Sequence, residues 1–586
     1  MSILKSLRWS QSGIFFLTLF ISTFPMALQQ TIPELDFLIT NAKIIDGTGS
    51  PWFLGSVGVL NGTIAFIQPN SSSITPIPSK LVISADGSYL TPGFFDSHTH
   101  DDIGILENGP AIAKILQGVT TIVTGNCGFS TYPFGSLERV KEHLESLLGE
   151  VDDRNMYDSF GAMQTSFITQ GHMPNVVSLV GHGPLRLSVM EFANREANET
   201  EIETMCEILE EQLVQGAAGI SLGLMYSPSN YASHAEMVAL GKVVSKYGRL
   251  LAAHIRTYEG GLVESVEEFV GVLRESGARG LLSHLQTAGK PYWGTRMTRA
   301  LEVLEIAREE GIDVAVDMYP YLAGSSTILQ ILPPSAMQEG FDEFLLKIEN
   351  PTYVNSLREL TENGQEPGWE SKVKLIGWEN ITVGSVDEPN LKRFEGMNVT
   401  AAAREIGLQE FDFVLLLVVE DLGRTNVIMF QQSQDDQNLV FGSRLQMVGS
   451  DSIPRSGGKP HPRGYGTFPR VLKNYVRESR IISLEEGVRK MTSMTAHRFG
   501  VLNRGIIRNG MAADLVMFDD NFEDGATFED PTKEPTQIHG VWINGEMVVD
   551  QNGMIIGGNS NPLKPGIVLA GDEIRLSKSA NKPKSR

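Results

Sequence analysis

Histidine, cysteine and aspartate recur where short apolar runs in the middle of the chain end. The residues at these endings are His98, His100, Cys127, His182, His254, His284, Asp317 and Asp451. Imidazole, thiolate and carboxylate groups are the usual protein ligands of zinc. One such ending is ordinarily structural, but so many in a single chain predict a metal-dependent active site.

The most specific local pattern is His98-x-His100. Residues i and i+2 of an extended strand share a face, so both imidazoles can hold one ion. The alternative is a polar strand end that follows Asp96.

The two cysteines have different surroundings. Cys127 follows a β-branched run and lies among glycines, where a thiolate could approach a metal; its alternative is a buried apolar thiol. Cys206 lies on the apolar face of a helical stretch and is predicted to be a core residue. A disulfide between the two would abolish the metal role of Cys127.

The segment from 94 to 500 alternates short β-branched runs with helical stretches, which predicts βα units and a parallel sheet. After the run that starts at GFFDSHTH, strands are expected at 120–128, 175–183, 219–224, 250–256, 280–286, 314–320 and 445–451. Eight strands predict an α/β fold, a (β/α)8 TIM-like barrel, in which the carboxyl ends of the strands carry the active site. Residues 330–440 are too long for a loop and are interpreted as an inserted cap.

Both flanks of this segment are rich in short β runs and Asn-Gly turns, at 32–93 and 501–570. Because the two flanks share this character, they are predicted to join into one small β-sandwich-like domain.

Composition excludes several classes of protein. The 586 residues include 48 basic and 70 acidic ones, and a surface with a net charge of −22 repels nucleic acid. Two cysteines are too few for a disulfide-built scaffold. The basic tail 571–586 is interpreted as disordered.

The N-terminus predicts entry into the secretory route. Residues 1–27 combine Lys5 and Arg8 with an apolar core too short to span a bilayer comfortably, which is typical of a signal peptide. An uncleaved membrane anchor is the alternative. Five sequons, at Asn61, Asn70, Asn198, Asn380 and Asn398, fit a secreted glycoprotein.

Several motifs resemble a known family. GFFDSHTHDD, Asp451 and NRGIIRNGMAADLVMFD look like the amidohydrolase superfamily of metal-dependent hydrolases. TGNCG (124–128), HIRTYEGG (254–261), SHLQTAG (283–289), DMYPYLAGSS (317–326) and the segment 450–472 resemble D-aminoacylases, the N-acyl-D-amino-acid deacylases. The resemblance covers residues 35–560, with the motifs in order.

The resemblance implies a zinc enzyme. Cys127, His254 and His284 would hold a tightly bound ion, and His98 and His100 would line a second, weaker position. A metal-activated water would attack the amide of an N-acyl-D-amino acid and release a carboxylate and a free D-amino acid. Asp451 would act as general base and then as general acid.

Substrate contacts are predicted for four further residues. Arg463 is expected to clamp the substrate carboxylate, and Tyr226, Tyr321 and Ser325 are expected to orient the substrate by hydrogen bonds. Each of the four has a structural alternative. Leu285-Gln286 departs from the family pattern, in which a basic residue often follows this histidine, and so puts the side-chain preference in doubt.

Two other functions stay open at this point. A cyclic-amide hydrolase of the dihydropyrimidinase or hydantoinase type would share the barrel, but such enzymes typically use a bridging lysine where Cys127 stands. An inactive secreted barrel that serves as a binding module would lack ligands, whereas all the expected ligand positions are filled.

Overall fold

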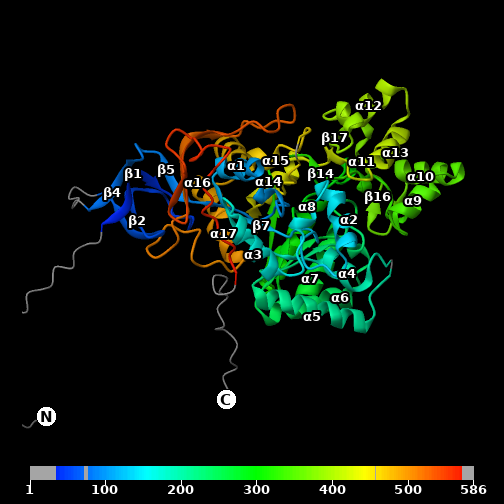
Figure 1. Ribbon diagram of the computed structural model, residues 1–586, viewed down its shortest axis with the longest axis horizontal. Helices are drawn as coiled ribbons and strands as arrows, with labels where there is room; N and C mark the ends of the chain where they lie inside the picture. Colours follow the sequence, from blue (N-terminus) through cyan, green and yellow to red (C-terminus); the bar gives the residue numbers. More distant parts are fainter. Residues whose placement is uncertain (1–33, 71–76, 194, 456, 571–586) are drawn as a thin grey trace, which may run out of the picture.

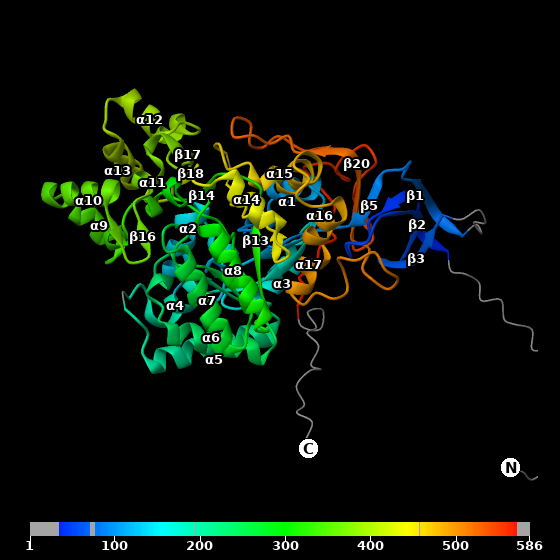
Figure 2. The ribbon, with the colours of Figure 1, turned by 180° about the vertical axis from the view of Figure 1, so that it is seen from behind.

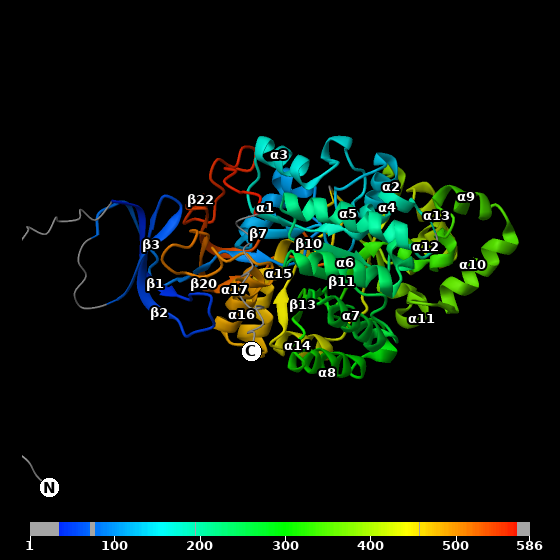
Figure 3. The ribbon, with the colours of Figure 1, turned by 90° about the horizontal axis from the view of Figure 1, so that it is seen from below.

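The computed structural model describes residues 34–70, 77–193, 195–455 and 457–570. Three parts lie in a row, with a β domain at one end, a barrel in the middle and a cap at the other end (Figures 1 and 3). The predicted signal segment 1–27 and the tail 571–586 lie outside the described residues. Within the described ranges, no helix has the length and apolar character needed to cross a membrane.

Eight parallel strands, each followed by helix, form the barrel and confirm the predicted fold class. They are β6 (Phe94–Asp96), β7 (Val119–Thr124), β8 (Asn175–Ser178) continued by β9 (Val180–Gly181), β10 (Gly219–Gly223), β11 (Leu250–His254), β12 (Arg279–Leu282), β13 (Val314–Met318) and β19 (Gln446–Val448). The last strand meets the first where the Ser97 amide donates to the Val448 carbonyl at 3.2 Å. The carboxyl ends of all the strands therefore converge on one mouth.

Strand periodicity determines which side chains face the barrel interior. In β11, Leu250 and Ala252 belong to the inner core, whereas Leu251 and Ala253 pack between the strands and the outer helices. Because side chains alternate along a strand, His254 follows Leu250 and Ala252 inward. Because the barrel interior covers one face of these strands and the helices cover the other, side chains on both faces are apolar, as in other covered parallel sheets.

Helices cover the outside of the barrel, and α6, α7 and α8 pack side by side (Figure 2). The covering helices are α1 (Asn108–Leu116), α2 (Leu137–Leu148), α3 (Phe160–Gln170), α4 (His182–Met190), α5 (Glu199–Gln215), α6 (His234–Lys246), α7 (Leu262–Ser276), α8 (Arg296–Glu309), α14 (Gln434–Gly442), α15 (Arg463–Arg470), α16 (Leu484–Met491) and α17 (Ser493–Arg498). Except for α2 and α17, their buried faces belong to the largest apolar core of the described residues.

Strands from both ends of the chain build the β domain. The N-terminal flank provides β1 (Leu35–Ile44), β2 (Phe53–Leu60), β3 (Thr63–Pro69), β4 (Ser79–Ser84) and β5 (Tyr89–Pro92), and the C-terminal flank provides β20 (Leu515–Glu523), β21 (Thr536–Ile543) and β22 (Glu546–Val549). They form one connected sheet, in which β5 pairs with β20. The Gly62 carbonyl accepts from the Ala513 amide at 2.9 Å, so the β2–β3 turn lies against the C-terminal flank and the sheet curls around its core.

The inserted cap has an apolar core of its own. Its antiparallel sheet consists of β14 (Gly324–Thr327), β18 (Asn426–Met429) and β17 (Ile381–Ser385), and its main helices are α9 (Phe341–Lys347), α10 (Pro351–Asn363), α11 (Lys372–Ile376), α12 (Val399–Ile406) and α13 (Glu410–Glu420). The insertion therefore begins at β14, before the predicted start at residue 330. It ends at β18, before the predicted end at residue 440, because α14 packs on α8 of the barrel.

Candidate metal centre and active site

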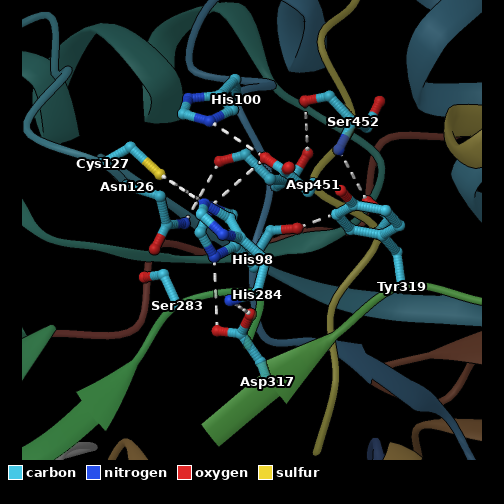
Figure 4. Close-up of polar contacts among 12 residues, drawn as sticks. His98, His100, Asn126, Cys127, Ser283, His284, Asp317, Tyr319, Asp451 and Ser452 are labelled. Carbon is cyan, nitrogen blue, oxygen red and sulfur yellow. Dashed lines mark hydrogen bonds and ion pairs between the residues drawn. The ribbon is translucent and has the colours of Figure 1, made fainter. Parts of the chain in front are cut away.

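Three of the polar strand ends have a left-handed backbone. The φ angle is +52° at Cys127, +31° at His284 and +51° at Asp451. Residues other than glycine adopt this conformation at a cost of roughly 1–3 kcal/mol, and such strain clusters at functional sites. The chain turns sharply at these three points, and the side chains meet at the mouth of the barrel (Figure 4).

Four ligand-type side chains converge there. The ligand atoms of His98, Cys127, His284 and Asp451 all lie within 4.8 Å of one another, and all four residues are buried. The Cys127 Sγ atom lies 3.2 Å from His98 Nε2 and 3.4 Å from His284 Nε2. His98 Nε2 lies 3.4 Å from Asp451 Oδ1. A thiol, two imidazoles and a carboxylate are a donor set that suits zinc.

Two further histidines border this cluster. The ring centroid of His254 lies 4.6 Å from that of His284, and neither ring nitrogen of His254 has a hydrogen-bond partner among the described residues. His100 Nε2 lies 3.3 Å from Asp451 Oδ1, and its Nδ1 atom likewise has no partner there. Buried polar atoms are ordinarily paired, so these free nitrogens fit a site for a metal ion. Of the five predicted metal ligands, three thus converge, and the other two, His100 and His254, lie next to them.

Asp317 orients two of these histidines. Its Oδ2 atom lies 3.3 Å from His98 Nδ1, and its Oδ1 atom accepts a hydrogen bond from the His284 amide at 2.7 Å. Such outer partners fix the ring orientation of metal-binding histidines. Asp317, one of the predicted polar strand ends, is therefore a positioning residue.

A buried network that the sequence interpretation missed ties together the strand ends that carry His98 and Asp451. Lys114 Nζ on α1 lies 2.8 Å from Asp96 Oδ2 and donates to Ser450 Oγ at 2.7 Å. Asp96 also accepts from the Ser450 amide at 2.8 Å. A lysine on a surface helix gives no signal in a sequence, and the one available sign was the position of Asp96 two residues before His98.

The surroundings of Asp451 keep it ionised. Burial acts to raise its pKa, but the Arg463 guanidinium and the neighbouring His100 and His98 hold the pKa well below its usual range. Arg463 Nη1 lies 2.8 Å from Asp451 Oδ2, and Arg463 is 1% exposed. Asp451 is therefore in the carboxylate form that a general base requires.

A pocket of about 40 Å³ beside the cluster contains three of the four predicted substrate-binding residues, Tyr226, Ser325 and Arg463. The Tyr226 ring is inclined at 65° to the His254 ring, with centroids 4.9 Å apart. The Ser325 carbonyl accepts from Arg463 Nη2 at 3.2 Å, and Ser325 Oγ donates to Asn426 Oδ1 at 2.8 Å. The cap strand β14 therefore holds the arginine in place.

Tyr321, the fourth predicted residue, does not line this pocket. Its amide donates to the Tyr319 carbonyl at 3.1 Å, which makes a tight turn at Pro320, and its hydroxyl donates to the Pro462 carbonyl at 3.4 Å. Tyr319 lines the pocket instead, with its ring centroid 4.7 Å from the Arg463 guanidinium. Because of this turn, Tyr319 occupies the position in the pocket that was predicted for Tyr321.

Two ion pairs lie near His254. Arg256, two residues after His254, pairs with Glu268 at 2.9 Å. Glu259 forms a buried pair with Lys372 of the cap, and both residues line the pocket. The cap therefore contributes a cation to the site at a place that the sequence interpretation left out.

His182 and Cys206 lie apart from the cluster. His182 Nε2 lies 2.8 Å from Glu236, which also pairs with the buried Arg186, so His182 is a structural residue. Cys206 packs against the main core. Both Cys127 and Cys206 are free thiols, which rules out the disulfide between them in this structure.

Comparisons with known proteins place the chain in a family. A model of the Amidohydrolase family matches residues 438–549. The N-acyl-D-aspartate deacylase of Alcaligenes xylosoxydans xylosoxydans is 32% identical over 93% of this chain and 97% of its own length. The chain belongs to the D-aminoacylase family of amidohydrolases. A second family member from the same bacterium, an N-acyl-D-glutamate deacylase, is 34% identical over 88% of this chain and 94% of its own length.

Solved structures agree with this family assignment. An N-acyl-D-glutamate deacylase from Bordetella bronchiseptica, complexed with zinc and a phosphonate inhibitor, superposes with a TM-score of 0.78 at 31% identity, covering 92% of this chain and 100% of that one. A D-hydantoinase from Thermus sp. reaches a TM-score of 0.52 at 15% identity over 92% of this chain and 99% of that one, so it shares the fold alone. The family resemblance seen in the motifs is confirmed, and the hydantoinase alternative loses its support.

Proposed function

We propose that this protein hydrolyses the amide bond of N-acyl-D-amino acids to a carboxylate and a free D-amino acid. The observation that carries the proposal is the convergence of His98, Cys127, His284 and Asp451 within 4.8 Å, in a chain that aligns with almost the full length of an N-acyl-D-aspartate deacylase. A barrel that served only as a binding module would need neither these buried ligands nor three strained backbone turns.

The residues present fit a bound zinc ion. Cys127, His254 and His284 would hold it tightly, and His98 and His100 would provide a second, weaker position. A bound zinc ion supplies a Lewis acid that polarises the scissile carbonyl group. Asp317 prepares the site by holding the His98 ring and the His284 backbone.

Asp451 moves the proton. Its Oδ1 atom faces His98 and His100 at the cluster, so it is placed to take a proton from the attacking water and to deliver it to the leaving nitrogen. The Oδ2 atom pairs with Arg463, which keeps the carboxylate ionised before the reaction.

Arg463 is the proposed partner of the substrate carboxylate. Its Nε and Nη1 atoms are buried and have no hydrogen-bond partner among the described residues, although Nη1 is in ion-pair range of Asp451. A guanidinium presents several donors in a fixed fork, which suits a carboxylate. Tyr319 stacks below this fork and keeps it aimed into the pocket.

Paired substrates test the proposal. Purified protein loaded with zinc is assayed with N-acetyl-D-amino acids and the matching L forms, and we expect hydrolysis of the D forms. Cleavage of only the L forms would overturn the proposed stereochemistry. Cleavage of hydantoins but of no open-chain amide would favour the cyclic-amide reaction instead.

We also propose that the protein enters the secretory pathway, as its signal-like N-terminus and sequons indicate. Asn61, Asn70 and Asn198 are exposed, which leaves these three sequons accessible for glycosylation. Expression in a eukaryotic host tests this proposal, because a glycosidase should lower the mass of the secreted protein. Retention of an unglycosylated protein in the cytosol would contradict it.

A further inference from the structure

A large cleft adjoins the small metal-side pocket, and the proposed chemistry at the metal site does not account for it. The cleft has a volume of about 490 Å³ and lies between α2 of the barrel and the start of the cap. Met225, Tyr226 and Gln330 line both the cleft and the metal-side pocket, so the two spaces meet at these residues. The metal-side pocket alone, at about 40 Å³, has little room beyond the reacting groups.

The walls of this cleft are mainly apolar. The apolar side chains that line it include Phe192, Leu329, Leu332, Met337, Phe341 and Leu345. Leu422 at its edge is 55% exposed. Contiguous apolar surface of this kind ordinarily marks a binding site, and the volume lies within the usual range for small-molecule pockets.

The charged side chains around the cleft are largely paired among themselves. Arg139 lies 3.3 Å from Glu142, and Arg424 lies 2.7 Å from Glu145. These side chains neutralise one another, so the cleft favours an uncharged chain of the ligand over a second charged group.

Tyr226 connects the cleft to the reacting centre. Its ring centroid lies 4.9 Å from that of His254, which lines the metal-side pocket, and 5.0 Å from that of Phe129, which lines the cleft. Arg463 and Gln286 line the metal-side pocket but not the cleft. A substrate whose carboxylate binds Arg463 therefore extends its other end, beyond the amide, past Tyr226 and into the cleft.

We infer that this cleft binds the acyl chain of the substrate, and that the preferred substrates carry long, unbranched apolar acyl groups. The inference rests on the proposed deacylase function and adds the substrate class to it. Each methylene that leaves water for the cleft stabilises the transition state, so kcat/KM should rise roughly fourfold per added methylene until the cleft is full.

An acyl-length series on the full-length protein tests the inference. One D-amino acid is offered with acetyl, butanoyl, hexanoyl, octanoyl and decanoyl groups, and kcat/KM is expected to rise along the series. A flat or falling series, with the acetyl form still hydrolysed, would overturn the inference and leave the deacylase function intact. Loss of all hydrolysis, the acetyl form included, would overturn both.

A matched pair of variants locates the effect. Leu345 lines the cleft, whereas its neighbour Leu346 on the same helix is 61% exposed and does not line it. Leu345→Asp should lower the ratio of decanoyl to acetyl kcat/KM by at least about tenfold, and Leu346→Asp should leave that ratio unchanged. Because both rates are measured on the same protein sample, their ratio does not depend on how much of the variant is folded. The acyl-length series on the wild type tests the inference without any variant.

The other possible occupant of the cleft is the amino-acid side chain. If rates rose with the length of that side chain instead of the acyl chain, and Leu345→Asp removed that rise, the cleft would be the side-chain subsite and the inference would be wrong.

Discussion

Replacing Asp451 with asparagine removes one charge and one basic oxygen from the reacting centre while it keeps the shape of the side chain. In the structure this carboxylate forms an ion pair with Arg463 at 2.8 Å and faces His100 and His98 at 3.3 Å and 3.4 Å. An amide can still lie in this space, but it cannot take a proton from water. We therefore expect Asp451→Asn to fold and to retain metal.

The expected loss follows from the role of Asp451 in proton transfer. Positioned general acid–base groups typically contribute about 10²–10⁴-fold to the rate. Because Asp451 serves both the attack and the departure of the amine, kcat should fall by at least about 10²-fold. The assay is hydrolysis of an N-acetyl-D-amino acid under saturating substrate, with bound metal measured on the same sample.

Asp317→Asn is the matched control. Asp317 is also a buried strand-end aspartate, but it contacts His98 Nδ1 and the His284 amide instead of the reacting atoms. Its loss should weaken metal binding by about 10–100-fold, and added zinc should restore the activity. Zinc should not restore Asp451→Asn. A value of kcat within tenfold of wild type for Asp451→Asn would refute the proton-transfer role.

Three further predictions concern the support of the site. Lys114→Met leaves the buried Asp96 without its cation, so the free energy of unfolding, measured in denaturant, should fall by roughly 3–5 kcal/mol. A change below about 1 kcal/mol would contradict this. A Cβ at Gly223 would collide with the Cys127 carbonyl oxygen, so Gly223→Ala should bind less zinc than the wild type at equal protein concentration. Full zinc occupancy in this variant would contradict the close packing. Burial raises the pKa of the Cys127 thiol to about 11, so zinc must displace a proton from this thiol when it binds at neutral pH. The affinity for zinc should therefore strengthen by at least about tenfold per pH unit between pH 6.5 and 8.5. Competition with a chelator that showed no pH dependence would contradict this prediction.

The sequence predicted the barrel well because its strands are fully buried. Continuous apolar runs between helical stretches leave a strong signal; His254 is the last residue of one such strand, and Cys127 lies shortly after the end of another. Both hairpin turns of the β domain, at Asn61-Gly62 and Asn544-Gly545, were also visible as Asn-Gly pairs.

The rest of the site depends on contacts between distant segments, which no local pattern records. Lys372 reaches Glu259 from the cap, and Lys114 joins Asp96 to a strand end late in the chain. The choice between Tyr319 and Tyr321 depended on one tight turn at Pro320. The cleft likewise exists only because the cap folds over α2, far from it in sequence.

The central claim is that metal held at this cluster is required for deacylation. The most direct test is to strip the protein with a chelator and titrate zinc back, while bound zinc and hydrolysis of an N-acetyl-D-amino acid are measured together. We predict negligible activity in the stripped protein and recovery in proportion to the first equivalent of zinc bound. Full activity in protein that holds no metal would contradict the claim.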